Sequence, residues 1–419
     1  MLTKMRGTRP VPSRRWLVTP AVIAASALAL AGCGSGSSGG GTAPAPSAAP
    51  AGEGGISTVN ITLANQSGTD VCTPDKNSVP AGPVTFTVKN ESAAGITELE
   101  LLKDQRILGE KENLAPGLDP VTFTLTLDGG SYQLYCPGAD QDHVDFTVTG
   151  AAAAAPTGTA QSILAQGTKD YAAYVVGQVD SLNTSVGELN TAVQSGNVDE
   201  AKTTYAKART YYEHAESGVE GFVLPGTAPE DNAGNLDYLI DMRESTPVDA
   251  AVGWSGFHAI ERDLWQGGAI TDETKKYSTD LVANVGKLQG VVAELQYRPE
   301  DLANGAAGLL EEVQSGKITG EEEQFSHLDL LDFAANVEGA QQAYASLRPG
   351  LEQIDSELVK NIDQQFESVQ TTLDGYRDPN AIGGFKPYTP ELQASDAAKL
   401  TASIQPLQES LSAVAQKVV

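Results

Sequence analysis

The sequence is poor in cysteine, histidine and basic residues. Of its 419 residues three are Cys and four are His, and 27 Lys and Arg stand against 54 Asp and Glu. Such an acidic chain repels phosphate backbones and attracts cations, which argues against a nucleic-acid partner and favours metal ions or cationic partners. A His-Glu-x-x-His zinc motif is also missing, because the four His, at positions 143, 214, 258 and 327, are too widely spaced.

The N-terminal segment lacks an apolar run long enough to span a bilayer. Five basic residues and no acidic one precede the short apolar run from Ala21 to Leu30, which ends in Leu30-Ala-Gly-Cys33. This pattern is typical of a bacterial lipoprotein signal. We expect residues 1–32 to be a signal peptide and Cys33 to be lipidated. Residues 33–55, rich in Gly, Ser, Pro and Ala, would form a flexible linker to the cell membrane, outside the cytoplasm.

Residues 56–150 are expected to form a small antiparallel β-sandwich. Apolar and polar residues alternate in short stretches, which Gly- and Pro-rich turn signals separate at the spacing of a sandwich. The clearest stretches run from Val59 to Leu63, Val84 to Val88, Val121 to Leu127 and Val144 to Val148.

Four potential metal ligands lie in this β domain. Cys72 and Cys136 are the two cysteines left beside Cys33, and in an oxidising compartment such a pair forms a disulfide or binds a metal. A strand that ends in Cys136, followed by a short loop and His143, resembles a cupredoxin, and Glu98 stands where a cupredoxin places its first His. The resemblance implies a second metal site for copper or iron at Cys72, Glu98, Cys136 and His143. A blue-copper centre is not expected, because it needs two His and a Cys.

The spacing of apolar residues changes from a strand-like to a helix-like period after a linker at residues 151–159. From Tyr171 to Val193 apolar residues recur every three or four positions, which predicts a long amphipathic helix. Similar segments follow at about 271–297, 300–315, 326–346, 351–376 and 390–417. Residues 160–419 are therefore predicted to form an all-α domain of two helix bundles.

One short segment of this domain, residues 254–265, carries a pattern typical of metal sites. His258 and Glu261 share a helix face at i and i+3, the spacing with which helical bundles bind metal ions. Ser255 is available to cap the start of this helix. An apolar stripe beside the pair places it at the edge of the core, where the imidazole and the carboxylate can converge on one ion. By itself the spacing fits a structural His with satisfied hydrogen bonds beside a solvated Glu better than a metal site.

Other acidic residues recur at helical spacing. Tyr205, Arg209, Tyr212 and Glu216 share one face, on which we interpret the tyrosines as packing residues and Glu216 as the functional candidate. The remaining groups are the pair Asp237 and Asp241 and the set Asp329, Asp332 and Asn336. Taken singly, each of these two acidic groups is better explained as a solvated surface or as a charge cluster at a helix N-terminus.

Several separated stretches of the helical domain together resemble the imelysin-like family. They are Gly256-Phe-His-Ala-Ile-Glu261, the segment from Gly305 to Val313 and the segment from Ser315 to Leu330. The resemblance implies two helix bundles with a metal site between helices. The ligands that it implies are Glu216, Asp241, His258, Glu261 and Glu322, with Glu321 as an alternative to Glu322.

A lipoprotein signal, a cupredoxin-like domain and an imelysin-like domain, in this order, resemble a component of a bacterial iron-uptake system. The resemblance implies a lipid-anchored, non-enzymatic protein that captures iron and delivers it to a membrane iron permease, with a secreted haem peroxidase as a further partner. Four carboxylates and one imidazole form a hard, oxygen-rich site that suits iron, as Fe2+ or Fe3+, better than copper. The alternative is a zinc metallopeptidase, because imelysin-like proteins have been classed with peptidases.

Overall fold

The structure, a computed structural model, describes residues 55–103, 106–151, 157–219, 223–224, 226–228, 231–244 and 248–419. The signal peptide, Cys33 and nearly all of the first linker lie outside these residues, so the expectations about them stay predictions. Within the described residues, no helix combines the length and the apolar character that crossing a membrane requires.

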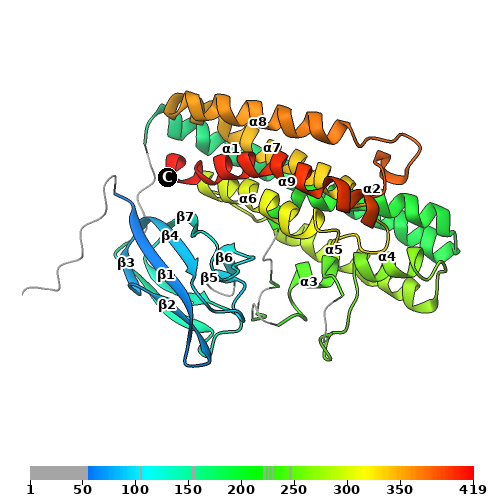
Figure 1. The fold of residues 1–419 in the computed structure, drawn as a ribbon, viewed down its shortest axis with the longest axis horizontal. Helices are drawn as coiled ribbons and strands as arrows, with labels where there is room; N and C mark the ends of the chain where they lie inside the picture. Colours follow the sequence, from blue (N-terminus) through cyan, green and yellow to red (C-terminus); the bar gives the residue numbers. More distant parts are fainter. Residues whose placement is uncertain are drawn as a thin grey trace, which may run out of the picture. The chain divides into compact units, whose positions relative to one another are not determined.

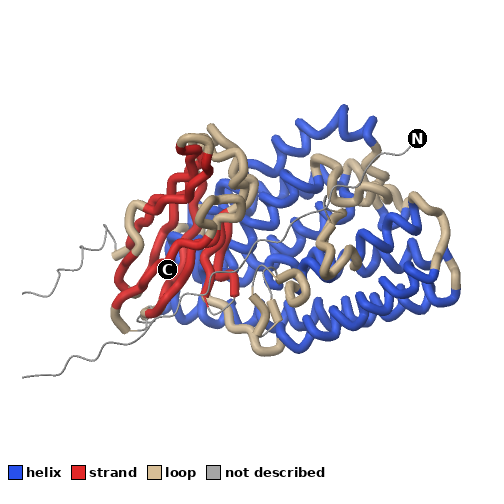
Figure 2. Tube along the Cα trace, turned by 90° about the horizontal axis from the view of Figure 1, so that it is seen from below, coloured by secondary structure: helices blue, strands red, loops and turns tan. Residues whose placement is uncertain are grey.

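Nine strands form two sheets in the β domain (Figures 1 and 2). The first sheet has the order β2-β1-β4-β7 and the second the order β3-β9-β8-β5-β6. The strands are β1 Ser57–Gln66, β2 Thr69–Pro74, β3 Ser78–Pro80, β4 Gly82–Asn90, β5 Leu99–Lys103, β6 Arg106–Lys111, β7 Val121–Leu127, β8 Gly130–Tyr135 and β9 His143–Thr149.

The predicted two-sheet architecture is confirmed, but the expectation of purely antiparallel pairing is corrected. β1 pairs with β4 in parallel, and β3 pairs with β9 in parallel, while the other pairs are antiparallel. After the hairpin of β1 and β2, the chain crosses to the second sheet as β3 and returns as β4 in the direction of β1. Such a crossover is what parallel neighbours require.

Alternating side chains of both sheets fill the core of the β domain. Val59, Ile61 and Leu63 of β1 are at most 1% exposed, and the rings of Phe86 and Phe123 stack with their centroids 5.0 Å apart. This burial follows the period of two by which strands place every second residue on one face.

The described residues after the β domain are helical apart from their connecting loops and turns and two isolated β-bridges (Figure 1). The helices are α1 Thr159–Ser195, α2 Val198–Val219, α3 Leu236–Asp241, α4 Phe257–Trp265, α5 Asp272–Val292, α6 Pro299–Glu312, the π-helix η1 Val313–Lys317, α7 Asp329–Ile354, α8 Ser356–Asp374, the 3-10 turn η2 Ile382–Gly384, α9 Pro390–Ser412 and α10 Ala415–Val418.

Helix α7 connects two groups of helices. It packs against α1 and α2, with α5 beside α1, and it also packs against α6 and α8, with α9 lying on both of these. Buried apolar side chains from both groups form one continuous cluster. The predicted all-α domain of two bundles is confirmed, with α7 shared between them.

Helix boundaries depart from the periodic pattern in two places near α6 and α7. The segment predicted at about 300–315 gives way after Glu312 to the π-helix η1, and α7 begins at Asp329 rather than near 326. Between them, residues 318–328 form turns and loops. This irregular stretch supplies several side chains of the site described below.

Polar contacts join the β domain to α6. The side-chain amide of Asn304 donates to the carbonyl oxygen of Thr124 at 2.7 Å, and the amide of Thr126 donates to Glu300 Oε1 at 3.0 Å. Lys111 of β6 also pairs with Glu311.

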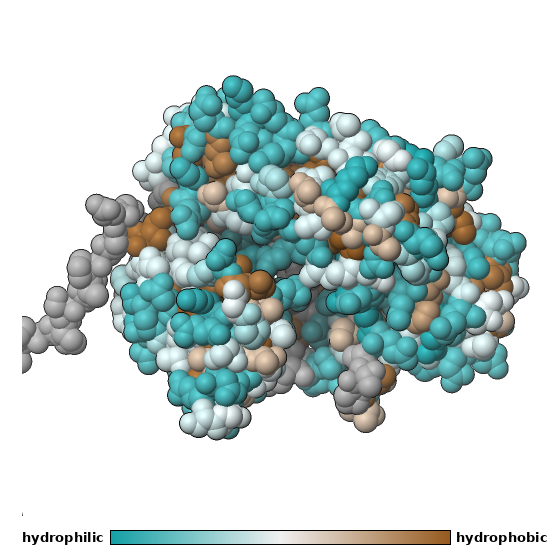
Figure 3. Space-filling model, viewed as in Figure 1, coloured by the Kyte–Doolittle hydropathy of each residue, from teal (hydrophilic) through white to brown (hydrophobic). Residues whose placement is uncertain are grey.

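Hydrophilic side chains predominate on the face shown in Figure 3, where hydrophobic residues are scattered. Among the described residues, the large apolar side chains that are exposed are Leu118, Val248, Ile354 and Ile382. Such isolated residues are normal on a protein surface.

Candidate metal centre

A glycine brings the end of α3 against the start of α4. Gly256 has a φ of 84°, and a Cβ there would lie 2.3 Å from the carbonyl oxygen of Ile240. Because only glycine tolerates both conditions, this position places Asp241, the last residue of α3, beside His258 in the first turn of α4. The predicted cap, Ser255, is wrong: Gly256 is the N-cap, and no side chain caps the helix.

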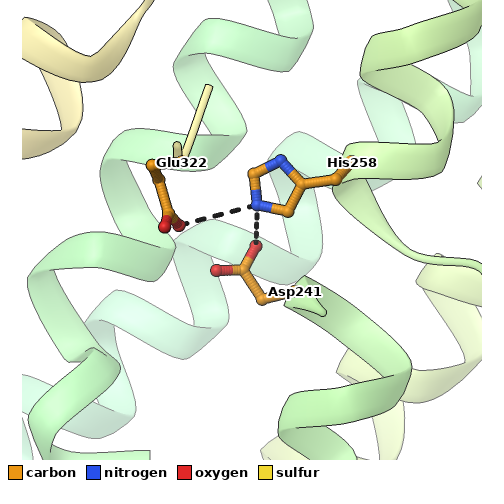
Figure 4. A group of neighbouring side chains, drawn as sticks. All are labelled: Asp241, His258 and Glu322. Atoms are coloured by element: carbon orange, nitrogen blue, oxygen red, sulfur yellow. Dashed lines mark ion pairs between the residues drawn. The ribbon is translucent and has the colours of Figure 1, made fainter. Parts of the chain in front are cut away.

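Asp241, His258 and Glu322 form the centre (Figure 4). His258 Nε2 lies 3.6 Å from Asp241 Oδ1 and 3.5 Å from Glu322 Oε1, and it has no hydrogen-bond partner although it is buried. These distances are too long for good hydrogen bonds, and the ligand atoms of the three residues lie within 4.8 Å of one another, close enough to share one ion. A buried nitrogen without a partner, facing two carboxylates, has the geometry of a metal ligand.

Glu261 lies on the other side of the imidazole. Its Oε2 is 3.0 Å from His258 Nδ1, and its Oε1 accepts hydrogen bonds from the amides of Phe325 and Ser326, both at 2.7 Å. The two ring nitrogens point in different directions, so the i,i+3 pair does not converge on the ion that Nε2 would hold. On the Nδ1 side, His258, Glu261 and Glu323 form a separate group whose atoms lie close enough to hold a metal ion. Glu261 instead orients the ring, as carboxylates behind metal-binding His commonly do.

The whole pair is buried rather than at the edge of the core. His258 is 1% exposed and Glu261 is 0% exposed, as are Phe257, Ile260 and Leu264 of the apolar stripe. The expectation of an edge position is therefore corrected: α4 is enclosed on its polar face as well, by α2, α3 and the loop after η1.

Glu216 belongs to a neighbouring group. It can share an ion with Glu213 and Asp241, and Asn336 Nδ2 donates to its Oε2 at 2.9 Å. Asp241 therefore belongs both to this group and to the centre at His258. Of the two alternatives in the Glu-rich loop, the structure places Glu322 at the centre, whereas Glu321 is exposed.

Two buried cations lie among these carboxylates, and sequence analysis missed the role of both. Arg209 is 0% exposed, and its guanidinium contacts Asp241, Asp332 and Glu322. It also contacts two further carboxylates, Glu213 and Glu323. Lys317, 1% exposed, lies among Glu213, Glu216, Glu312 and Glu322. For Arg209 the sequence did contain a signal. It lies on a helix face with two tyrosines that were expected to be buried, and an Arg is almost never buried unless it is paired with acidic groups.

Some residues that the sequence predicted to be packing or surface groups form hydrogen bonds with the acidic residues in and around the centre. The hydroxyl of Tyr205 donates to Glu323 at 2.9 Å, and that of Tyr212 donates to Asp237 at 2.6 Å. Asp329 is buried, not solvated, and accepts a hydrogen bond from the amide of Glu323. The tyrosines therefore pack and hold carboxylates at the same time.

The electrostatics favour a bound cation. Burial raises the pKa of Asp241 well above its usual range, although Arg209 and His258 oppose this. Burial alone would lower the pKa of His258, but Asp241, Glu261 and Glu322 outweigh it and raise that pKa well above its usual range. Burial likewise opposes charge on Glu322, but Lys317, His258 and Arg209 hold its pKa well below the usual value. The raised pKa values of Asp241 and His258 favour protons on these two groups, and a metal ion that bound both would have to displace them.

The four residues of the expected second metal site are not brought together. Cys72 and Cys136 form a disulfide, so neither offers a thiolate. His143 stacks near Tyr135 and contacts Asp142, while Glu98 lies with Glu100 and Glu110. Among the described residues, no group able to hold a metal contains His143 or either cysteine. The structure thus takes the disulfide alternative.

Comparisons with known proteins match both the helical domain and most of the chain. The sequence model of the imelysin family matches residues 167–414. The iron uptake system component EfeO of Escherichia coli O1:K1 is 34% identical over 359 residues, which cover 85% of this chain and 90% of the relative. The EfeO proteins of E. coli strain K12 and of Shigella flexneri are 33% identical over the same shares. The chain therefore belongs to the family of imelysin-domain proteins that includes these EfeO components.

Proposed function

We propose that this chain is a lipid-anchored, extracytoplasmic iron-binding protein that captures iron and delivers it to a membrane iron permease. One observation carries the proposal: the buried His258 Nε2, without a hydrogen-bond partner, faces Asp241 and Glu322. The names of its relatives, which are components of an iron uptake system, support iron as the cargo.

The residues of the centre would divide the work of binding. Asp241, His258 and Glu322 hold the ion, Glu261 fixes the ring through Nδ1, and Glu216 lies next to the ion through the group that it shares with Asp241. Carboxylate oxygens and one imidazole favour iron over ions that prefer thiolates. Capture is coupled to proton release, because His258 must lose the proton on Nε2 before it can bind.

The zinc metallopeptidase is not favoured by any contact at this site. A catalytic zinc of that class takes two closely spaced His with a Glu as the base. Here His214 contacts Gln178 and Glu338 away from the centre, and Glu261 is held by His258 and two backbone amides. We therefore propose a binding protein rather than an enzyme.

Anaerobic Fe2+ titration of the mature protein, residues 33–419, tests the binding proposal. The wild type should bind the ion, and His258→Ala should weaken binding tenfold or more, about 1.4 kcal/mol for each decade. His214→Ala is the matched control, because it removes an imidazole of the same domain outside the centre, and it should bind as the wild type does. Equal affinity of the wild type and His258→Ala would overturn the proposed site.

Delivery to the permease depends on the proposed anchor. A linker of roughly twenty residues gives reach and raises the effective concentration of the protein at the membrane. Cys33→Ser should leave iron affinity unchanged, release the protein from the membrane fraction and lower cellular iron uptake. Retention at the membrane would contradict lipidation of Cys33, and full uptake from released protein would contradict the need for proximity. The secreted haem peroxidase remains a proposed partner of the same system.

A further inference from the structure

Lys317 occupies the position of a cation inside the acidic site. Its Nζ lies 3.2 Å from Glu213 Oε2, 3.2 Å from Glu312 Oε1, 3.6 Å from Glu216 Oε2 and 3.8 Å from Glu322 Oε1. Of these four contacts, the one to Glu312 has hydrogen-bond geometry. The ammonium is thus surrounded by oxygens at nearly equal distances, as a bound ion would be.

One of these ion-pair partners, Glu213 Oε2, is a buried carboxylate oxygen. Glu213 is 0% exposed, and its Oε2 has no hydrogen-bond partner among the described residues, although it points toward the ammonium. Glu213, Glu216 and Asp241 form a group whose oxygens lie close enough to share a metal ion. The oxygens around Lys317 are therefore suited to a metal as well as to an ammonium.

The backbone is irregular where the lysine enters. Lys317 is the last residue of the π-helix η1, and π-turns inside helices are frequent at functional sites. Gly316 before it leaves no room for a side chain without displacement, because a Cβ would lie 3.2 Å from Arg243 Nη1 and 3.3 Å from Glu322 Oε2. This local winding turns Lys317 inward.

The lysine position and the His258 centre share carboxylates. Glu322 Oε1 lies 3.5 Å from His258 Nε2 and 3.8 Å from Lys317 Nζ, and Asp241 belongs to both groups of potential ligands. In carboxylate-rich helical bundles, adjacent positions of this kind hold two metal ions. Here the imidazole of His258 is a ligand at one position, and the ammonium of Lys317 occupies the other.

We propose that Lys317 is an internal cation that fills a second metal position and so limits the centre to one ion. The proposal rests on the proposed function, since it presupposes a first ion at His258. A lysine ammonium is a compact point charge on a flexible stem, which suits it to replace an ion among oxygens. Its removal would leave Glu216 and Glu312, together with the Glu213 and Glu322 carboxylates that Arg209 still contacts, around the position of a second divalent cation.

Metal stoichiometry of the full mature protein tests this. Equilibrium dialysis against anaerobic Fe2+, followed by elemental analysis, should give one ion for the wild type and two for Lys317→Gln and Lys317→Met. Lys317→Arg keeps the charge and should bind one ion. Lys207→Gln removes a positive charge from the exposed face of α2 and should also bind one, which separates the local effect from the change in net charge.

Electron paramagnetic resonance with Mn2+ gives a second measurement. The wild type should show the six-line signal of an isolated ion, and Lys317→Gln should show the exchange-broadened signal of two ions about 3.5–4 Å apart. One isolated ion in both neutral variants would overturn the proposal. No binding by the wild type would instead overturn the proposed function.

Misfolding of the neutral variants is also informative. If Lys317→Gln and Lys317→Met do not fold without metal, refolding with two equivalents of Mn2+ should restore the wild-type circular dichroism spectrum, because an ion that binds the native state stabilises it. Failure of both variants to refold with Mn2+ would show that the lysine is only a structural counter-ion.

Discussion

The β domain and the helical domain bury polar side chains in different ways. In the β domain, the hydroxyls of Thr85 and Thr124 pair at 2.8 Å, Asn90 binds three carbonyl oxygens of nearby loops, and a disulfide joins residues 64 positions apart. In the helical domain, Arg209 and Lys317 are buried among carboxylates, and a buried imidazole nitrogen has no hydrogen-bond partner.

The difference shows that buried charged groups need more from their surroundings than buried neutral polar groups do. Neutral polar pairs are inexpensive to bury when they are hydrogen-bonded, whereas buried charges lose their hydration and are stable only when neighbouring charges balance them. The β domain therefore has a core like that of most proteins with an added cross-link. The helical domain maintains a charge network in which Arg209 and Lys317 face buried carboxylates, and in which we propose that a metal ion binds.

The largest effect is expected when that balance is broken at its centre. Arg209→Leu should lower the free energy of unfolding of the helical domain by about 3–5 kcal/mol, because it leaves several buried carboxylates without their partner. Denaturant unfolding followed by circular dichroism would measure it. In the control Arg348→Leu, the lost pair with Asp363 is solvent-exposed, so the loss should stay below about 1 kcal/mol. Equal losses would contradict a special role of the buried network.

The disulfide is expected to matter for the β domain alone. Replacing both Cys72 and Cys136 by Ser should lower the stability of that domain by about 4 kcal/mol on the chain-entropy scale for a loop of this length. Iron affinity should not change, since neither sulfur is near the centre. Unfolding measurements and Fe2+ titrations of the same variant would test both statements. A fall in iron affinity would contradict the claim that the disulfide affects the β domain alone.

A smaller effect is expected from the backbone that joins α3 and α4. Gly256→Ala should cost about 1–3 kcal/mol and weaken iron binding about tenfold, because the added Cβ separates Asp241 from His258. Gly253→Ala is a matched control, since Gly253 also has a positive φ, 81°, but no atom within 4 Å of the added Cβ. If both variants bind iron equally well, the close approach at Ile240 does not position the centre.

The pH dependence of the metal-free protein gives the smallest effect. Burial raises the pKa of Asp329 to about 8 and that of Asp332 to about 7, the latter despite Arg209. Folded carboxyls with raised pKa values hold protons that the unfolded chain releases, so their contribution to stability is fully present below about pH 4 and is lost as pH rises from there to about 7 to 8. Asp329→Asn should raise stability above that range by about 1 kcal/mol, measured by thermal unfolding. Asp374→Asn on the surface should change nothing in this window.

Local patterns in the sequence were sufficient for the secondary structure of most of the chain. Apolar residues with a period near 3.6 predicted α1 from Tyr171 to Val193, and alternation predicted β1 and β4, because one face of each element is buried. The parallel pairing of β1 with β4 could not be predicted in this way, since it depends on where the chain crosses between the sheets.

The candidate site was predicted in its members but not in its arrangement. Helical spacing selected His258, and the resemblance to the imelysin-like family implied Asp241 and Glu322; the structure brings these three residues together. Neither signal revealed that Glu261 lies behind the ring, because an i,i+3 pair can meet through either imidazole nitrogen. Glu213 gave no separate signal, since acidic residues are frequent throughout this chain.

The sequence by itself determined the two domains, their secondary structure and the hard, acidic character of the metal ligands, because these follow from local periodicity and side-chain chemistry. Only the tertiary structure decided which charges face one another. Arg209, Asp332 and Lys317 come from α2, α7 and η1, and their contacts exist only where these elements meet. Lys317 turns inward because a π-helix replaces the last turn of α6, a change of register that the helical period does not contain.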